Sequence, residues 1–492
     1  MSILPALYDV AQVRALDAAA IRAGTSGYTL MKRAAEAALR VLRSRWPRAL
    51  QLCVVAGGGN NGGDGYALAR YARAAGLAVQ VLAVVEPPRL HGEALQACED
   101  FQASGGSILA WDPAHLHEAD VIVDALLGVG LSAAVREPTL AVIRAINEAG
   151  KPVLSLDLPS GLDGDRGVAL GDAVRADATV SFVALKRGLF LGDGPEYCGR
   201  LLFDDLGVPV PAEPQFQPRL TRVADEEIAA ALPPRRRQAN KGDFGRVLLV
   251  GSGAGMPGAV RLAGESCLRV GAGLVSTATA LENVATIAGG RPELICLGVR
   301  SVDDLDAPLA AATVVAIGPG LGRSAWAQSL LDRVLACGKP LVLDADALNL
   351  IAEHGLATPA NAILTPHPGE AGRLLGIPTA EVQADRLAAL QALTQKHPGV
   401  IVLKGAGTLI GARGRTPALC ERGNPAMAAP GMGDVLTGTI AGILAQCRDP
   451  DAAARVGVLV HALAGDELER QGARSLLALD VAQALGRWVG GT

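Results

Sequence analysis

Length and composition limit the kind of protein this chain can be. Its 492 residues are enough for about two or three domains, and half of them are hydrophobic. With 45 basic and 49 acidic residues the net charge is −4, which gives no general attraction to nucleic acid or to an anionic membrane. Aromatic residues make up only 3%, so surfaces that stack bases are scarce, whereas the 60 glycines exceed the roughly 7% of an average protein.

The cysteines and the first residues indicate a reducing compartment. Eight cysteines are widely scattered, with no CxxC pair and no Cys/His spacing typical of zinc sites, so we interpret them as reduced core thiols. No apolar run approaches the roughly 20 residues of a membrane-spanning helix, and the start lacks the basic and then apolar pattern of a signal peptide. We therefore expect a cytoplasmic protein.

Apolar, strand-like runs alternate with helical patterns in the first part of the chain. The runs occupy residues 50–56, 79–85, 120–126, 152–158 and 178–184, and the helical patterns cover residues 66–75 and 139–149. Within residues 207–220 four prolines exclude a regular helix or a central strand, so we place a linker there.

The alternation then restarts, with apolar runs at residues 246–250, 274–278, 313–317, 340–343, 362–365 and 400–403. Continuous apolar strands that alternate with helices predict parallel sheets covered by helices on both faces. We thus expect two α/β domains, residues 1–214 and residues 215–492. Such sheets bind ligands at the carboxyl ends of their strands.

A glycine-rich string, GGGNNGGDG, follows the first apolar run and begins at Gly57. We expect a helix from about Tyr66 onward, and glycine amides at a helix N-terminus suit a phosphate group. Gly57, Gly59 and Gly62 satisfy GxGxxG, and Glu86 after the next run could hold a ribose hydroxyl, which would indicate a dinucleotide oxidoreductase. That pattern is weak by itself, and a pyrophosphate site does not require the two amides and the carboxylate of this string.

Acidic residues gather at the same strand ends. Asp64 lies in the glycine-rich string, Asp124 begins DALLGVGL, and Asp157 and Ser160 lie in SLDLPSGLDGD. Carboxylates beside a phosphate repel it unless a cation intervenes, and the oxygens of Asn61, Asp124 and Ser160 suit a hard cation. Helix and turn capping by these residues, including an N-cap at Asp64, stays open as the alternative.

Three of these strings resemble a known family. In their order, VVAGGGNNGGDGYALAR, DALLGVGL and DLPSGLDGDRG resemble the NAD(P)H-hydrate epimerase domain of the YjeF N-terminal type, which implies a Rossmann-like three-layer fold. The resemblance implies that Asn61, Asp124 and Ser160 bind potassium and that Asp157 contacts the reacting ring, which makes Asp157 the candidate catalytic acid/base. It implies a binding site for the hydrated dinucleotide that comprises Asp157 with Asn60, Asn61, Gly62, Gly63, Asp64, Gly128, Val129, Gly130, Leu131, Ser132, Ala133 and Ala134.

Glycine-rich strings also follow the apolar runs of the second half. In PGMGDVLTG, residues 430–438, glycines precede Asp434 and a helical pattern begins at Val435. Such a site can stabilise a transferring phosphoryl group while the carboxylate takes a proton from the attacking hydroxyl, although a helix cap at Asp434 fits equally well. Lys404 suits either a nucleotide phosphate or a solvated strand end, and His367, between two prolines, is by itself more often structural than catalytic.

The second half resembles the ADP-dependent NAD(P)H-hydrate dehydratase domain, which has a ribokinase-like fold. The strings KGDFGRVLLVGSG, GAGLV, GPGLG, LDADALN, LTPHPGE, KGAGT and NPAMAAPGMGDVLTG occur in the family's order over nearly all of residues 241–488. One departure is Ala426, where the family commonly has glycine. The resemblance implies a pocket for the hydrated dinucleotide lined by Ala259, Gly322, His367 and Asp434, and an ADP site, used with magnesium, lined by Lys404, Gly405, Ala406, Gly407, Thr408 and Gly433.

Together the two resemblances imply repair of damaged nicotinamide cofactors. The first domain would interconvert the R and S hydrates of NADH and NADPH, and the second would dehydrate the S form at the expense of ADP, with Asp157 and Asp434 as catalytic residues. We expect these small molecules as partners, no nucleic acid or membrane, and a homo-oligomer. Two alternatives stay open: a ribokinase-like kinase of a vitamin or sugar with a regulatory first domain, and a non-enzymatic nucleotide sensor.

Overall fold

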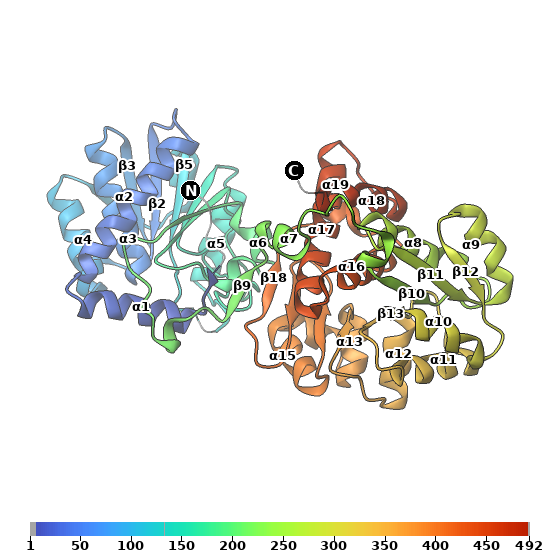
Figure 1. Ribbon diagram of the computed structural model, residues 1–492. Coiled ribbons are helices and arrows are strands. Elements are labelled where there is room, and N and C mark those ends of the chain that lie inside the picture. Colours follow the sequence, from blue (N-terminus) through green and yellow to red (C-terminus); the bar gives the residue numbers. More distant parts are fainter. Residues whose placement is uncertain (1–5, 132, 491–492) are drawn as a thin grey trace. The chain divides into compact units, whose positions relative to one another are not determined.

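The computed structural model describes residues 6–131 and 133–490. The chain divides into two compact units between Leu220 and Thr221 (Figure 1). The proline-rich segment belongs to the first unit, because Phe216 is buried in its core and the Gln12 side chain donates hydrogen bonds to the carbonyls of Gln215 and Gln217, at 3.3 and 2.7 Å. The division therefore lies six residues beyond the expected one.

Unit 1 is built on a parallel sheet with strand order β4-β3-β2-β5-β6-β7-β8. Its elements are β1 (Ala6–Leu7), α1 (Val10–Arg22), α2 (Gly27–Arg45), β2 (Gln51–Ala56), α3 (Asn60–Ala74), β3 (Ala78–Ala83), α4 (Gly92–Ala103), β4 (Ser107–Ala110), β5 (Val121–Ala125), α5 (Thr139–Glu148), β6 (Val153–Leu156), β7 (Ala178–Phe182), α6 (Gly194–Cys198) and β8 (Arg200–Asp204).

Alternate residues of β2 enter two different cores, which makes unit 1 a three-layer structure. Leu52 and Val54 pack in the core that contains the buried faces of α1, α2, α3 and α4, whereas Cys53 and Val55 pack in the core with α5. Side chains of a strand point alternately to opposite faces of the sheet, so a strand buried on both faces is apolar throughout. This confirms the interpretation of the continuous apolar runs.

Unit 2 has the strand order β9-β18-β17-β16-β15-β14-β13-β10-β11-β12. Its elements are β9 (Leu220–Arg222), α7 (Glu226–Ala231), β10 (Arg246–Val250), α8 (Pro257–Arg269), β11 (Leu274–Thr279), α9 (Val284–Gly290), β12 (Ile295–Gly298), α10 (Asp306–Ala311), β13 (Val314–Ile317), α11 (Ala325–Leu335), β14 (Leu341–Leu343), α12 (Ala345–His354), β15 (Ala362–Leu364), α13 (Pro368–Leu375), α14 (Thr379–Ala384), α15 (Arg386–Lys396), β16 (Val400–Leu403), β17 (Thr408–Gly411), β18 (Ala418–Cys420), α16 (Met432–Cys447), α17 (Pro450–Arg470), α18 (Ala478–Ala484) and α19 (Gly486–Val489).

The sheet of unit 2 is also sandwiched between helices, with α8, α16 and α17 on one face and α11 to α13 and α15 on the other (Figure 1). From β16 to β12 the neighbouring strands are parallel, but β17 pairs antiparallel with both β16 and β18. The sheet is therefore mixed at this end, where the sequence analysis predicted parallel strands only.

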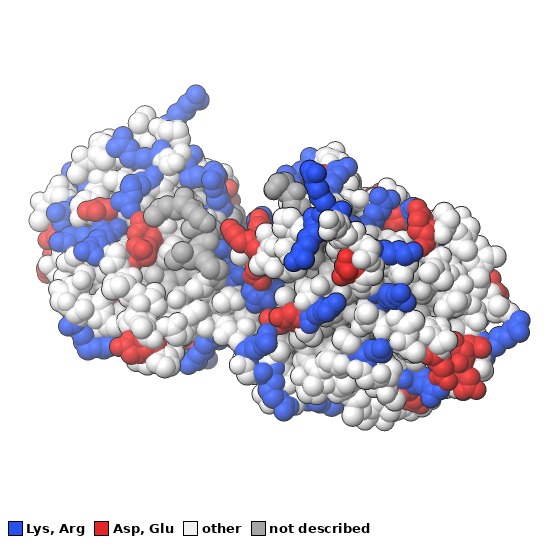
Figure 2. Space-filling model, viewed as in Figure 1, with Lys and Arg blue, Asp and Glu red and all other residues white. Residues whose placement is uncertain are grey.

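The charged surface, the cysteines and the helices bear on the expectations drawn from composition. On the face drawn in Figure 2, basic and acidic side chains are interspersed, with no extended basic area among the residues that the structure describes. All eight cysteines are free, and five of them are buried. No described helix is both long and apolar enough to cross a bilayer.

Candidate active sites of the two units

A cavity of about 730 Å³ lies at the carboxyl ends of β2, β5, β6 and β7 in unit 1, and α1 and α2 form its other wall. The sequence predicted many of the residues that line it: Asn60, Asn61, Asp64, Gly128, Val129, Gly130, Leu131 and Asp157. Gly62, Gly63, Ala133 and Ala134 are not among the lining residues, and Ser132 lies outside the described residues. Glu86, the candidate ribose ligand, is exposed and does not line this cavity.

The helix after the glycine-rich string begins at Asn60 rather than near Tyr66. Gly62 and Gly63 lie in its first two turns and serve close packing, because a Cβ at Gly62 would lie 2.1 Å from the Gly57 carbonyl oxygen and one at Gly63 2.4 Å from the Met31 methyl. The first turn of the helix therefore packs against its own preceding loop and against Met31, and a role of these two glycines in binding the dinucleotide stays a prediction.

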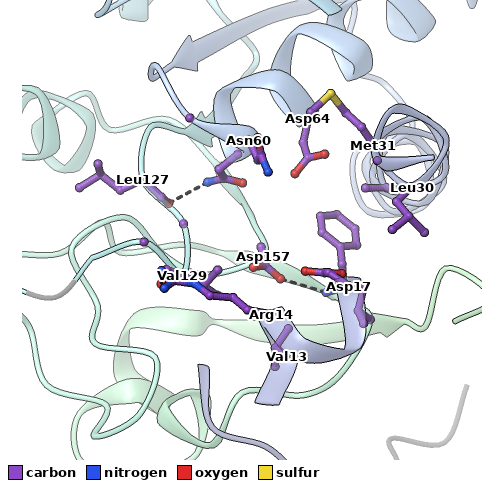
Figure 3. A pocket seen from close by; sticks show the side chains of 18 of the residues that line it. Val13, Arg14, Asp17, Leu30, Met31, Asn60, Asp64, Leu127, Val129 and Asp157 are labelled. Atoms are coloured by element: carbon purple, nitrogen blue, oxygen red, sulfur yellow. Dashed lines mark hydrogen bonds between the residues drawn. The ribbon is translucent and has the colours of Figure 1, made fainter. Parts of the chain in front are cut away.

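The helix cap suggested for Asp64 is wrong, since the N-cap is Gly59 and no side chain caps this helix. Asp64 points into the cavity instead, toward the wall that carries Asp157 (Figure 3). Burial, strengthened by the negative charges of Asp157 and Asp17, raises the pKa of Asp64 well above its ordinary value.

Asp157 follows β6 with a backbone φ of +67°, a conformation that non-glycine residues rarely adopt and that is often found at functional sites. Its Oδ1 accepts a hydrogen bond from the Phe182 amide at 3.1 Å and an ion-paired hydrogen bond from Lys186, whose side chain is 1% exposed. Lys186 also donates to the Phe182 carbonyl at 2.8 Å. Asp17, on α1, lines the same cavity, and burial raises its pKa to about 6.

The three residues predicted to bind potassium lie together at the edge of the cavity, where Asn61 and Ser160 both donate hydrogen bonds to the Leu127 carbonyl. Asp124 is buried in β5, and its carboxylate accepts hydrogen bonds from the Ser160 hydroxyl at 2.5 Å, the Ser160 amide at 2.8 Å and the Ser155 hydroxyl at 2.8 Å. The Asn61 side chain donates to the Leu127 carbonyl at 2.7 Å, but its buried Oδ1 has no hydrogen-bond partner among the described residues. An unpartnered amide oxygen close to a buried carboxylate fits a hard cation.

In unit 2, Lys404 and Asp344 form the centre of a buried polar cluster. Lys404 Nζ lies 2.7 Å from Asp344 Oδ1 and 3.7 Å from a carboxylate oxygen of Glu370. The second oxygen of Asp344 accepts a hydrogen bond from Thr437 of α16 at 2.7 Å. Lys404 is thus a largely buried, ion-paired lysine whose side chain is 17% exposed, and the opposite charges of Asp344 and Glu370 outweigh its desolvation and raise its pKa.

Asp434 lies beside this cluster, in the first turn of α16. It does not cap the helix, because the N-cap is Gly431, with φ +86° and no side-chain hydrogen bond. Burial, reinforced by the negative charges of Asp344 and Asp346, raises the pKa of Asp434 to about 7, although Lys404 opposes that change. A carboxyl group with such a pKa can act as a base near neutral pH.

The other predicted dinucleotide ligands of unit 2 occupy different places around these strand ends. His367 is the N-cap of α13, where its Nδ1 accepts a hydrogen bond from the Gly369 amide at 3.0 Å, so it has the structural role that the sequence left open. Gly322 lines a second cavity of about 570 Å³, and its amide donates to the Asp346 carboxylate at 2.9 Å. Ala259 lies on α8, near Gly320.

One buried arginine holds the loop predicted to bind ADP, which runs through Lys404, Gly405, Ala406, Gly407 and Thr408. The Arg386 guanidinium donates from one nitrogen to the carbonyls of Leu403, Lys404 and Gly407, at 3.2, 3.3 and 3.2 Å. Burial lowers the pKa of Arg386 to about 10. A Cβ at Gly433 would lie 3.5 Å from Lys404 Nζ, so the first turn of α16 approaches this loop.

Comparison with known proteins gives a family for each unit. A family model described as YjeF-related protein N-terminus matches residues 27–188, and one described as NAD(P)H-hydrate dehydratase matches residues 247–487. The bifunctional NAD(P)H-hydrate repair enzyme Nnr of Coxiella burnetii is 49% identical over 479 residues, which cover 96% of this chain and 97% of that relative. The Escherichia coli K12 enzyme of the same name is 43% identical over 467 residues, which cover 95% and 90%. The chain belongs to the bifunctional NAD(P)H-hydrate repair enzyme family.

A solved structure confirms the fold that the resemblance implied for the second half of this repair enzyme. A ribokinase-like superfamily protein from Enterococcus faecalis V583 is 31% identical, with a TM-score of 0.51, and the match covers 55% of this chain and 95% of that chain. The family assignments also confirm that the strings around NNGGDG and PGMGDVLTG mark an epimerase-type and a dehydratase-type unit.

Proposed function

We propose that this chain restores hydrated NADH and NADPH to the normal cofactors in two steps. Unit 1 interconverts the R and S hydrates, and unit 2 dehydrates the S hydrate while ADP is converted to AMP and phosphate. The observation that supports this most directly is the pairing in one chain of two family units that each place an acidic residue, Asp157 or Asp434, in a buried polar cluster.

In unit 1 the hydrated dinucleotide would occupy the cavity around Asp157, which would exchange protons with the reacting ring. Asn61, Asp124 and Ser160 would hold potassium. The bound ion would neutralise the buried Asp124 carboxylate, whose partners among the described residues are hydrogen-bond donors and no basic side chain, and would stabilise phosphate groups nearby. Replacing potassium by tetramethylammonium should therefore slow epimerisation, while the dehydration of the S hydrate continues.

In unit 2 Asp434 would remove the proton from the ring hydroxyl, whose oxygen then attacks the terminal phosphorus of ADP. The hydroxyl becomes a phosphate ester, and the ring nitrogen lone pair expels phosphate as the carbon–oxygen bond breaks; loss of the neighbouring ring proton then completes the double bond. Phosphate leaves far more readily than hydroxide. That difference is the chemical reason for a dehydration that consumes a nucleotide. Lys404 and the adjoining loop would bind the ADP phosphates.

Magnesium would bind mainly through the nucleotide. Among the described residues no group of three or more His, Cys, Asp or Glu side chains has a metal-binding arrangement. Magnesium commonly keeps several waters and binds through one or two carboxylates plus substrate phosphates, so this sparse donor set fits the ion. When bound, it would neutralise charge on the phosphates during transfer.

One assay tests the proposal: the purified chain is given mixed R and S hydrates with ADP and magnesium, and the return of the reduced-nicotinamide absorbance is followed. We expect full recovery, with one AMP formed per cofactor restored. Recovery of the S portion alone, at the spontaneous rate of epimerisation, contradicts the assignment of unit 1, and no recovery contradicts both. A stable phosphorylated product would instead support a kinase. A cytoplasmic location and a homo-oligomer remain predictions, tested by fractionation and by light scattering.

A further inference from the structure

Epimerisation of the hydrate, the activity proposed for unit 1, sets a geometric requirement on the cavity. The carbon that inverts carries a hydroxyl and is bonded to the ring nitrogen. If that hydroxyl leaves from one face and water adds to the other, one group must protonate the leaving oxygen and a second must take a proton from the incoming water. Two carboxyl groups on opposite walls of the cavity meet this requirement.

Asp64 and Asp157 occupy opposite walls. Asp64 extends from α3, Asp157 lies in the loop after β6, and Figure 3 shows their carboxyl groups pointing toward one another across the space that the cavity provides. The two elements belong to neighbouring parts of the sheet, since β2, which leads into α3, pairs with β5, and β5 pairs with β6.

The surroundings of the two carboxyl groups differ. Asp157 is ion-paired to the buried Lys186 and accepts a hydrogen bond from the Phe182 amide, and these two contacts fix the orientation of its side chain. Asp64 makes no hydrogen bond or ion pair with any residue in the described ranges. Met31 lines the same cavity, and burial together with the negative charges of Asp157 and Asp17 favours the protonated form of Asp64.

We propose that Asp64 and Asp157 are the acid–base pair of the epimerisation, one on each face of the inverting carbon, and that the inversion exchanges the hydroxyl with water. In one direction protonated Asp64 gives its proton to the hydroxyl, the ring nitrogen lone pair expels water, and a carbon–nitrogen double bond forms. A second water then attacks the opposite face and passes a proton to Asp157. The reverse direction uses the two groups in opposite roles, and proton exchange with solvent restores the starting state.

This role for Asp64 goes beyond dinucleotide binding, and its chemistry differs from ring opening. Opening of the carbon–nitrogen bond would also invert the carbon, but the original oxygen would stay on it as an aldehyde. Exchange of the hydroxyl instead brings one solvent oxygen into the product at each inversion. The oxygen isotope therefore separates the two chemistries.

The test is a single-turnover epimerisation of one pure hydrate isomer by the full chain in water enriched in oxygen-18, without ADP. We expect every inverted molecule to carry one heavy oxygen, measured by mass, while the uninverted substrate stays unlabelled. Inverted product without the label would overturn the inference. A wild-type chain that inverts neither isomer faster than solvent does would overturn the proposed function of unit 1 as well, so the two failures are distinguishable.

Variants separate a chemical role from a structural one. Asp64→Asn should slow epimerisation by about 10²- to 10⁴-fold, the usual contribution of a positioned acid or base, while the rate of S-hydrate dehydration stays at the wild-type value. The exposed Asp193→Asn in the same unit is the matched control and should leave both rates unchanged. A wild-type epimerisation rate in Asp64→Asn would overturn the proposal.

The pH dependence of kcat for epimerisation distinguishes a chemical role of Asp64 from a purely structural one. The ionisable groups that line the cavity around Asp64 are Asp17 and Arg14 on α1, Asp157 and Lys186. Asp17→Asn removes a negative charge that raises the pKa of Asp64. The pKa of Asp64 should therefore fall, and the decrease of kcat for epimerisation at alkaline pH should begin at a lower pH. An unchanged alkaline limb in Asp17→Asn would contradict Asp64 as the acid.

Discussion

Asp434 illustrates how the environment of one residue sets the pH dependence of a reaction. Its pKa is raised to about 7, so as a base it is largely protonated, and inactive, below that pH. We predict that kcat/KM for dehydration of the S hydrate falls about tenfold per pH unit below pH 7, measured as AMP formation. A flat profile between pH 8 and pH 5 would contradict the role of Asp434 as the base.

A variant of a neighbouring residue tests the cause of that pKa. Asp346 adds to the negative charge around Asp434, so Asp346→Asn should lower the pKa of Asp434 and move the acid limb to lower pH. The exposed Asp332→Asn on α11 is the matched control, and its profile should coincide with that of the wild type. If both variants moved the acid side of the dehydration profile equally, the charge of Asp346 would not be the cause of the raised pKa of Asp434.

Sequence reasoning found the acids at strand ends and missed their partners. Asp157 and Asp434 are in distinctive strings, but Asp17, Lys186 and Arg386 carry no motif signal. Asp17 is one polar position in an alanine-rich helix, and Lys186 comes four residues after the end of β7, where it resembles any strand-end lysine. Their roles follow from contacts with residues that are far away in the chain, which spacing alone does not encode.

At the scale of elements, the start of α3 shows why a helix boundary was misplaced. Gly62 and Gly63 have low helix propensity, so the sequence predicted a loop up to Tyr66. In the fold, the Gly57 carbonyl leaves no room for a Cβ at Gly62, and Met31 packs closely against Gly63, so tertiary contacts outweigh propensity. The strands predicted from apolar runs, in contrast, lie within a few residues of their observed bounds, because burial on both faces makes them apolar throughout. The partly exposed end strands β4, β8 and β12 were not predicted.

This packing yields a prediction for unit 1. Gly62→Ala places a methyl group 2.1 Å from the Gly57 carbonyl oxygen, so the first turn of α3 must shift, at a cost of about 1–3 kcal/mol in the free energy of unfolding. We expect lower stability of unit 1 in urea and slower epimerisation, with dehydration unaffected. At Gly59 an added Cβ meets nothing within 4 Å, so the stability of Gly59→Ala should stay close to that of the wild type. Equal loss in both variants would contradict the packing argument.

The loop after β16 yields a prediction for unit 2. Arg386→Met removes the donor that holds the carbonyls of Leu403, Lys404 and Gly407, so the loop loses its fixed conformation. We expect the KM for ADP in the dehydration to rise about tenfold, equivalent to about 1.4 kcal/mol, while epimerisation keeps its rate. An unchanged KM for ADP would show that Arg386 does not organise this loop for the nucleotide.

At the scale of the whole molecule, two α/β units and their order along the chain were predictable from the alternation of apolar runs with helical patterns. The antiparallel strands β17 and β18 were not, because three- or four-residue strands next to glycine turns give little periodicity. The proline-rich segment correctly excluded a central strand, but its packing on unit 1 depends on Phe216 and Gln12, more than 200 residues apart.

We propose that one chain carries two separate reactions that act in series, and recovery from the pure R hydrate requires both of them. The full chain is given this isomer with ADP and magnesium, and the return of the reduced-nicotinamide absorbance is compared between wild type, Asp157→Asn and Asp434→Asn. We predict fast recovery in the wild type, recovery limited to the spontaneous rate of epimerisation in Asp157→Asn, and accumulation of the S hydrate without recovery in Asp434→Asn. Recovery at the wild-type rate in either variant would contradict the account.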